Sequence, residues 1–457
     1  MQKVCIFAGE MSKKITYISA DEAVSVIRSH QHIHLGGVAN VPAVLVEALV
    51  RAADAGQFHD LHFHHIHTEG SAPYGSRDYE GIFFDQGFFV GANVRSSVNA
   101  GYADYIPVHL EETPEMYRSG ALPCDVALIQ VSEPNASGHV SLGTSVDCTK
   151  AAIECAKTVI AVVNPCVPFA YGDLITVDDI DIFVRDNRAL PTVEFPEPSA
   201  LDMAIGRNCA ELIQDGACLQ MGIGSLPTAI TRHLGNHKNI GIHSELFSEG
   251  VVDLVEKGVI NGSLKAIDRG KIVASFLLGG KRLYDFIDHN KDVQMRDISY
   301  TNDPWIIARN PNVVSINFAT EIDLTGQICA DSIGTRIYSG TGGQLDFVKG
   351  ARRSPGGKSI IAMPSRTKNG KSKLVPILTP GAGVVTPRAD AQWIVTEYGA
   401  ANLYGKSLQE RAQLLINIAH PDDREALDMA AFERFGPHYK AVYSNITDNR
   451  VPVYVKK

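Results

Sequence analysis

The chain carries a set of short motifs twice, in the same order in its two halves. Four pairs match at offsets between 176 and 201 residues: 37–42 (GVANVP) with 222–227 (GIGSLP), 66–69 (IHTE) with 242–245 (IHSE), 133–138 with 321–326, and 157–161 with 358–362. Ordered matches with slowly drifting offsets indicate one fold present twice. Duplicated α/β halves usually place their active site where they meet.

Short apolar runs alternate with amphipathic stretches, which is typical of α/β domains with mainly parallel sheets. Prolines cluster between the halves, and Ser199 is predicted to cap a helix that begins near Ala200. We therefore predict two related α/β domains, residues 1–190 and 199–457, with the active site at their interface. The elements predicted are strands over 33–35, 126–131, 159–163, 313–316 and 360–363, helices over 41–53 and 424–435, and an extended end.

Composition excludes several functions and suggests a compartment. The net charge of −9 over 457 residues argues against nonspecific nucleic-acid binding, which needs a basic footprint. No apolar run reaches the roughly 18 residues of a membrane span, and the first 16 residues do not resemble a secretion signal. The eight cysteines show no CxxC spacing, so we expect reduced thiols and a cytoplasmic protein.

A histidine cluster, His62, His64, His65 and His67, is the first candidate for chemistry, because some zinc sites begin with HxH at a strand end. On a strand, His62 and His64 would share one face while His65 and His67 share the other. The four side chains would therefore not converge on one ion. We expect no metal site, and a zinc-dependent hydrolase using residues 62–67 is kept as a distant alternative.

Two glycine segments and one glutamate form a stronger candidate. Residues 220–224 (QMGIG) end a predicted strand, and residues 339–347 (SGTGGQLDF) form a dense glycine loop. Glycine lets a backbone approach a ligand and aim its N–H groups at negative charge, although a plain tight turn is the alternative interpretation. Glu245 follows an apolar strand, which suits a general base or nucleophile better than a surface charge.

These motifs, with 250–254 (GVVDL), 321–326 and 396–399 (TEYG), closely resemble class I coenzyme A transferases. The similar subgroup is the acetyl-CoA hydrolase/transferase family, which includes 4-hydroxybutyrate CoA-transferase and butyryl-CoA:acetate CoA-transferase. The resemblance covers essentially the whole chain, and GGQxDFxxGA at 342–351 is its most specific part. It implies an enzyme in which Glu245 becomes a glutamyl-CoA thioester, with Glu69 as a noncatalytic relic in the first half.

The resemblance also implies the binding residues. Coenzyme A is expected to contact Gln220, Met221, Gly222, Ile223, Gly224, Thr320, Gly343 and Lys368. Gly342, Asn302 and Glu397 are the expected polar or oxyanion partners near the nucleophile. No tightly bound cofactor is expected, because CoA thioesters and short-chain carboxylates are the substrates, and a homo-oligomer is expected from the family.

The predicted activity is transfer of CoA between acetyl-CoA and butyrate or 4-hydroxybutyrate, with ping-pong kinetics. Two alternatives stay open: an acetyl-CoA hydrolase, in which water resolves the same adduct, and a noncatalytic CoA-binding protein, against which the retained Glu245 argues. The acid (butyrate, 4-hydroxybutyrate, propionate or succinate) and the direction of transfer stay open as well.

The glycine motifs contain no arginine to pair with a second carboxylate. An unpaired carboxylate is costly to desolvate. We therefore expect monocarboxylates to be preferred over succinate by at least about tenfold in kcat/KM. Arg95, Arg309 or Arg336 would overturn this if one of them reached the pocket.

Overall fold

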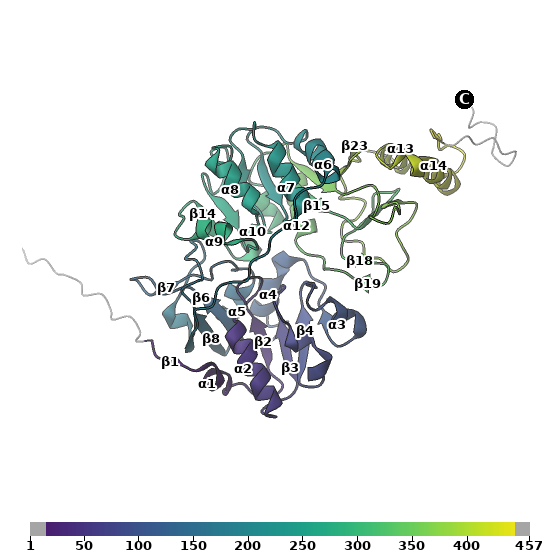
Figure 1. Cartoon of the computed structure of the whole chain (residues 1–457). Coiled ribbons are helices and arrows are strands. Elements are labelled where there is room, and N and C mark those ends of the chain that lie inside the picture. Colours follow the sequence, from purple (N-terminus) through teal and green to yellow (C-terminus); the bar gives the residue numbers. More distant parts are fainter. Residues whose placement is uncertain (1–14, 444–457) are drawn as a thin grey trace, which may run out of the picture.

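The computed structural model describes residues 15–443, so the predicted extended end lies partly outside the described residues. The two halves of the chain form two lobes, and α13 and α14 lie at the side of the second lobe (Figure 1). None of the described helices is long and apolar enough to cross a membrane.

The first half is built on an eight-stranded sheet whose paired strands are all parallel, in the order β1-β10-β8-β6-β2-β3-β4-β5. Its strands are β1 (Tyr17–Ile18), β2 (His32–Leu35), β3 (Leu61–His64), β4 (Phe83–Gly87), β5 (Asp104–Tyr105), β6 (Val126–Val131), β8 (Thr158–Val163) and β10 (Ile182–Arg185). The helices are α1 (Ala20–Val24), α2 (Ala43–Asp54), α3 (Arg95–Ala100), α4 (Thr113–Arg118) and α5 (Thr149–Cys155), with 3₁₀ turns η1 (Pro73–Gly75), η2 (Arg77–Tyr79), η3 (Leu110–Glu112) and η4 (Val177–Asp179). A separate antiparallel pair joins β7 (His139–Val140) to β9 (Ile175–Thr176).

The second half is built on a six-stranded sheet in the order β12-β11-β15-β20-β22-β23, in which only β23 pairs antiparallel. Its strands are β11 (Cys218–Met221), β12 (Gly241–Ile242), β15 (Val313–Phe318), β20 (Lys358–Ala362), β22 (Trp393–Thr396) and β23 (Gly399–Asn402). The helices are α6 (Ala200–Ala210), α7 (Ser225–His233), α8 (Glu249–Glu256), α9 (Lys281–Ile287), α10 (Ile298–Thr301), α11 (Pro304–Ile307), α12 (Gln344–Arg353), α13 (Leu408–Asn417) and α14 (Pro421–Phe435). Small sheets pair β13 (Ile272–Ala274) with β14 (Val293–Met295), β16 (Glu321–Asp323) with β17 (Ile328–Cys329) and β21 (Leu374–Val375), and β18 (Ser332–Ile333) with β19 (Arg336–Ile337).

The two sheets confirm the duplication that the motifs indicated. Five strands of the first sheet lie in the order β10-β8-β6-β2-β3, and five of the second lie in the equivalent order β22-β20-β15-β11-β12. The central strands β6 and β8 are apolar along nearly their whole length because the sheet is covered on both faces. The predicted α/β fold with two related halves is therefore correct.

The stretch between β10 and α6 contains no helix or strand. Ser199 then begins α6 through a capping box, since its hydroxyl accepts from the backbone N–H of Asp202 while the Asp202 carboxylate accepts from Ser199. The domain boundary at residues 190–199 falls in this stretch, and it stays a prediction.

The halves share one apolar core, which contains side chains from both sheets, such as Ile129 and Leu219. Backbone hydrogen bonds also join them: the N–H of Val146 donates to the Ser275 carbonyl, and the N–H of Leu277 donates to the Thr144 carbonyl.

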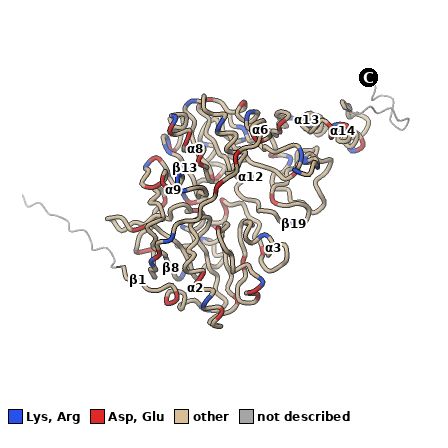
Figure 2. The backbone as a smooth tube through the Cα atoms, viewed as in Figure 1, with Lys and Arg blue, Asp and Glu red and all other residues tan. Residues whose placement is uncertain are grey.

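Acidic and basic positions are interleaved along both lobes (Figure 2).

Candidate active site

The second sheet brings its glycine loop and its glutamate to one edge. The strands β11 and β12 are parallel neighbours, so the loop at Gly222 and the segment ending at Glu245 leave the sheet at the same end. The Ser244 hydroxyl ties them together by donating to the Met221 carbonyl at 3.2 Å. The glycine loop and Glu245 therefore start from adjacent strand ends.

The Glu245 carboxylate is part-buried and receives two hydrogen bonds. The side-chain amide of Asn302 donates to Glu245 Oε2 at 2.7 Å, and the backbone N–H of Gly343 donates to the same carboxylate. Burial raises the pKa of Glu245 to about 7, and the two donors act in the opposite direction. The group thus changes charge near neutral pH.

Gly343 can lie close to the Glu245 carboxylate because it has no side chain. It is the N-cap of α12, with an ordinary φ of −91°. A Cβ at this position would overlap both Glu245 Oε2 and the Asn302 amide nitrogen. The N-terminus of a ten-residue helix therefore faces the carboxylate directly, where the helix dipole favours negative charge.

The first half holds the loop that carries Gly343. The N–H of Val90 donates to the Ser339 carbonyl at 3.0 Å, and the N–H of Thr341 donates to the Tyr105 hydroxyl at 2.8 Å. The Gly342 carbonyl accepts from Leu110, and its φ of +61° is one that glycine adopts without strain. Both halves therefore contribute to this candidate site.

The first glycine loop, residues 220–224, runs from the end of β11 to the N-cap of α7. Gln220 and Asn317 exchange side-chain hydrogen bonds at 3.1 and 3.2 Å across β11 and β15, and Met221 is buried. Gly224 has a φ of +113° and is the N-cap of α7. The loop 222–224 thus precedes a helix N-terminus, the position expected for anion or oxyanion contacts.

Three predicted residues lie elsewhere on this edge, and none of them hydrogen-bonds Glu245 within residues 15–443. The Thr320 hydroxyl donates to the carbonyls of Cys329 and Ser332. Lys368 is exposed in the turn after β20. Glu397 accepts from the backbone and the hydroxyl of Ser365, at 2.9 and 2.6 Å.

Sequence reasoning did not assign roles to the polar neighbours of Glu245 and Asn302. Asp346, inside the GGQLDF motif, lies 3.4 Å from the Asn302 amide. Glu111 arrives from the first half and donates its backbone N–H to Asp346 at 3.4 Å. The only sequence signal for Asp346 was the motif itself, and nothing in the sequence placed Glu111 here.

The histidine cluster does not lie on a single strand as expected. The strand β3 ends at His64, so His65 and His67 are not on its opposite face. The rings have separate partners, since His64 contacts His32 at 2.9 Å, His65 contacts Asp85 at 2.8 Å and His67 contacts Glu69 at 3.2 Å. In the described part of the chain, no group of three or more His, Cys, Asp or Glu side chains is placed to hold a metal ion.

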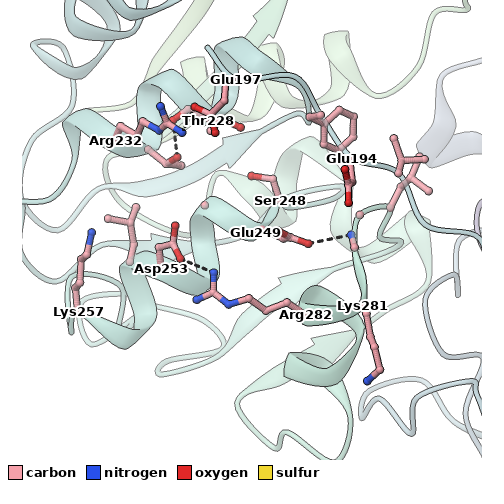
Figure 3. Close-up of a pocket in the computed structure, with 18 residues that line it drawn as sticks. Glu194, Glu197, Thr228, Arg232, Ser248, Glu249, Asp253, Lys257, Lys281 and Arg282 are labelled. Atoms are coloured by element: carbon pink, nitrogen blue, oxygen red, sulfur yellow. Dashed lines mark hydrogen bonds and ion pairs between the residues drawn. The ribbon is translucent and has the colours of Figure 1, made fainter.

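One sizeable cavity does not include Glu245 among its lining residues. It has a volume of about 540 Å³ between α7, α8 and the connecting stretch at Glu194 and Glu197 (Figure 3). Two pairs of its charged side chains contact each other, since Arg232 contacts Glu197 at 2.6 Å and Arg282 contacts Asp253 at 2.6 Å. These pairs leave this cavity a weaker candidate than the glycine loops.

Comparison with known proteins assigns the chain to a family. Residues 8–194 match the acetyl-CoA hydrolase/transferase N-terminal domain, and residues 279–431 match the C-terminal domain of the same family. The chain therefore belongs to the acetyl-CoA hydrolase/transferase family.

Individual relatives match over nearly their whole lengths. A 4-hydroxybutyrate coenzyme A transferase of Clostridium kluyveri is 46% identical, covering 92% of this chain and 97% of the relative. A succinyl-CoA:acetate/propanoyl-CoA:succinate CoA transferase of Fasciola hepatica is 44% identical, covering 91% and 87%. The crystal structure of RipA from Yersinia pestis superposes with a TM-score of 0.86 at 34% identity, covering 92% and 97%. These matches confirm the class, CoA-transferase, that the sequence motifs indicated.

Proposed function

We propose that this chain transfers CoA between acetyl-CoA and a short-chain monocarboxylate, butyrate or 4-hydroxybutyrate, through a glutamyl-CoA thioester on Glu245. One observation carries the proposal: a part-buried carboxylate is held by the Asn302 amide and the Gly343 N–H, at the junction of two halves. The family supports the substrate class, and the 4-hydroxybutyrate transferase of Clostridium kluyveri supports the acid.

The bonds made and broken in the proposed reaction involve Glu245 and the two substrates. A carboxylate oxygen of Glu245 attacks the thioester carbon of acetyl-CoA and expels the CoA thiolate, leaving a mixed anhydride. The thiolate then attacks the glutamyl carbonyl, which releases acetate and leaves glutamyl-CoA. The incoming carboxylate reverses the two steps with its own acyl group, so atoms and charge balance.

Each addition builds negative charge on an oxygen, which needs donors already in place. The Asn302 amide and the Gly343 N–H already face the glutamyl carboxylate. The 222–224 loop is proposed to supply the N–H groups for the substrate side. Loss of one such donor typically costs about 3 kcal/mol in the transition state.

The proposed CoA contacts are Gln220, Met221, Gly222, Ile223, Gly224, Thr320, Gly343 and Lys368, with Gly342 and Glu397 as further polar partners. Remote contacts of this kind supply binding energy that is used at the reacting centre. We also propose a cytoplasmic homo-oligomer without a tightly bound cofactor.

The test is capture of the adduct. The protein is incubated with acetyl-CoA alone, treated with borohydride and digested, and the peptide containing Glu245 is analysed by mass spectrometry. We expect a reduced glutamyl group at Glu245, absent from Glu245→Ala, which should lose transfer almost wholly. Glu245→Asp should also fail, because a misplacement of about 1 Å can cost 100-fold. An unmodified peptide with full activity would refute the proposal.

Hydrolysis and transfer are separated by the acceptor. CoA release from acetyl-CoA is measured with and without added butyrate, and transfer predicts that the acid accelerates turnover. A rate independent of any acid would identify a hydrolase.

A kinetic panel of acids then identifies the acceptor. Arg309 and Arg336 are exposed, and Arg95 donates to the Tyr338 carbonyl at 2.5 Å and lies over the Tyr338 ring. The expected preference for monocarboxylates stays a prediction. The Fasciola hepatica relative is named for succinate, so equal turnover of succinate and butyrate is the informative contrary result.

A further inference from the structure

Asp346 is a buried carboxyl group, and no Lys or Arg side chain among residues 15–443 forms an ion pair with it. It occupies the third position of α12 and is 2% exposed. Its side chain is within 3.4 Å of the Asn302 amide nitrogen and of the Glu111 backbone N–H, and His109 Nδ1 lies at 3.8 Å. A buried carboxylate usually needs an Arg or Lys partner, so this placement calls for an explanation.

The surroundings favour the neutral form of Asp346. Burial raises its pKa well above the ordinary value, and the nearby Glu111 and Glu245 carboxyl groups act in the same direction. Glu111 is itself shifted to a pKa of about 7, first by burial and then by Asp303. Lys349, one turn further along α12, lowers the pKa of both Glu111 and His109.

Asn302 connects this neutral group to the nucleophile. The side chain of Asn302 is fully buried, and its amide nitrogen carries two hydrogens. That nitrogen is 2.7 Å from Glu245 Oε2 and 3.4 Å from Asp346 Oδ2, while the Asn302 carbonyl oxygen accepts from the Thr301 hydroxyl at 3.1 Å. Glu245, Asp346 and Thr301 together fix the plane of the amide.

An ordinary capping role does not explain Asp346. An acid at this helix position usually accepts from the backbone N–H of the N-cap residue. In α12 the N-cap is Gly343, whose N–H donates to Glu245 instead. In α6, by contrast, Asp202 at the same position forms the usual capping box with Ser199.

We propose that Asp346 is a positioning residue for the transfer reaction. It accepts one of the two hydrogens of the Asn302 amide and thereby keeps the other hydrogen directed at Glu245. The inference rests on the proposed function, but its central claim concerns the Asn302–Glu245 hydrogen bond, which is measurable without turnover. A negative charge at Asp346 would oppose the Glu245 carboxylate, so the neutral form is the working one.

The experiment compares Asp346→Asn with Asp346→Ala. Asparagine keeps a neutral carbonyl acceptor for Asn302, whereas alanine removes it. We expect Asp346→Ala to lower kcat at least about tenfold with KM for acetyl-CoA changed less than about threefold, because the lost interaction orients a reacting group. Asp346→Asn should keep more than about a third of the wild-type kcat.

A second readout follows the titration of Glu245 itself. The pH dependence of carbodiimide labelling of Glu245 is measured by peptide mass spectrometry. The midpoint should move to higher pH in Asp346→Ala, because a loosened Asn302 stabilises the carboxylate less, and should stay in place in Asp346→Asn. This readout separates failure of the inference from failure of the transferase proposal.

The matched control is Asp202→Ala, which removes an aspartate from the same helix position in α6. It should lower thermal stability without moving the Glu245 midpoint. The inference is overturned if Asp346→Ala leaves kcat and the midpoint unchanged, or if the asparagine and alanine variants lose equal activity. It is also overturned if Asp202→Ala moves the midpoint as far as Asp346→Ala does.

Discussion

At the scale of single residues, the environment of Glu245 sets opposing demands on one carboxyl group. Burial disfavours its charged form, while the Asn302 amide and the Gly343 N–H favour it. Burial dominates and leaves the pKa at about 7. A carboxylate less hydrated than one in water is also a stronger nucleophile, so the compromise suits attack on a thioester.

This balance predicts how activity depends on pH. In the proposed mechanism only the ionised form of Glu245 attacks, so kcat/KM for acetyl-CoA should fall about tenfold per pH unit below about 7. Asn302→Ala removes a donor that favours the anion and should therefore move this limb to higher pH, besides lowering the rate. The check is a pH–rate profile of the two proteins at saturating acceptor, and a limb that stays in place in Asn302→Ala would show that another group titrates.

Residues of the site differed in how visible they were in the sequence. Glu245 and Gly343 lie in motifs that are visible in the sequence, and the structure places Gly343 against Glu245. Glu111 gave no signal, because it reaches Asp346 only after the two halves pack. Glu397 accepts hydrogen bonds from Ser365, and its expected role beside Glu245 stays a prediction.

At the scale of elements, the buried strands were the most predictable parts. The apolar runs at 126–131 and 159–163 became β6 and β8 because strands covered on both faces must be apolar throughout. The two- and three-residue strands β16 to β19 were not predicted, since they are too short to show an alternating pattern. The helix α13 was missed as well, although Ser407 and Glu410 form a capping box at its start.

The start of α12 gives the second prediction. Gly343→Ala keeps a permitted φ but puts a methyl group against Glu245 Oε2 and the Asn302 amide. We expect kcat to fall at least about 100-fold, because the carboxylate and its donor must move apart. The fold should be retained.

Gly235→Ala is the matched control, because a Cβ there would meet nothing within 4 Å. Both variants are assayed for transfer and followed by thermal unfolding. Equal activities for the two alanine variants would mean that the close approach of Gly343 to Glu245 does not matter for turnover.

At the scale of the whole molecule, the sequence predicted the duplication but not how the halves hold each other. Each half keeps the same strand order, in agreement with the repeated motifs. The contacts between halves do not repeat: the loop at Gly172 pairs in parallel with Met295 at the end of β14, and Asp173 accepts from the Asp297 N–H at 2.7 Å. Such pairing forms only when the halves pack together, so it produces no periodic pattern in the sequence of either half.

Gly172 therefore provides a test of how far the junction stabilises the protein. Its φ is +128°, and a Cβ would overlap the backbone of Met295. Gly172→Ala should lower the thermal midpoint clearly, because it combines backbone strain with a clash against rigid main chain.

Gly120→Ala is the control, since Gly120 also has a positive φ, +75°, but nothing lies within 4 Å of its Cβ position. Circular dichroism melts of the two variants should show the larger loss at Gly172, together with reduced adduct formation at Glu245, whose donor loop is held by the first half. Equal losses would mean that strain alone is felt and that the Gly172–Met295 pairing contributes little to joining the halves.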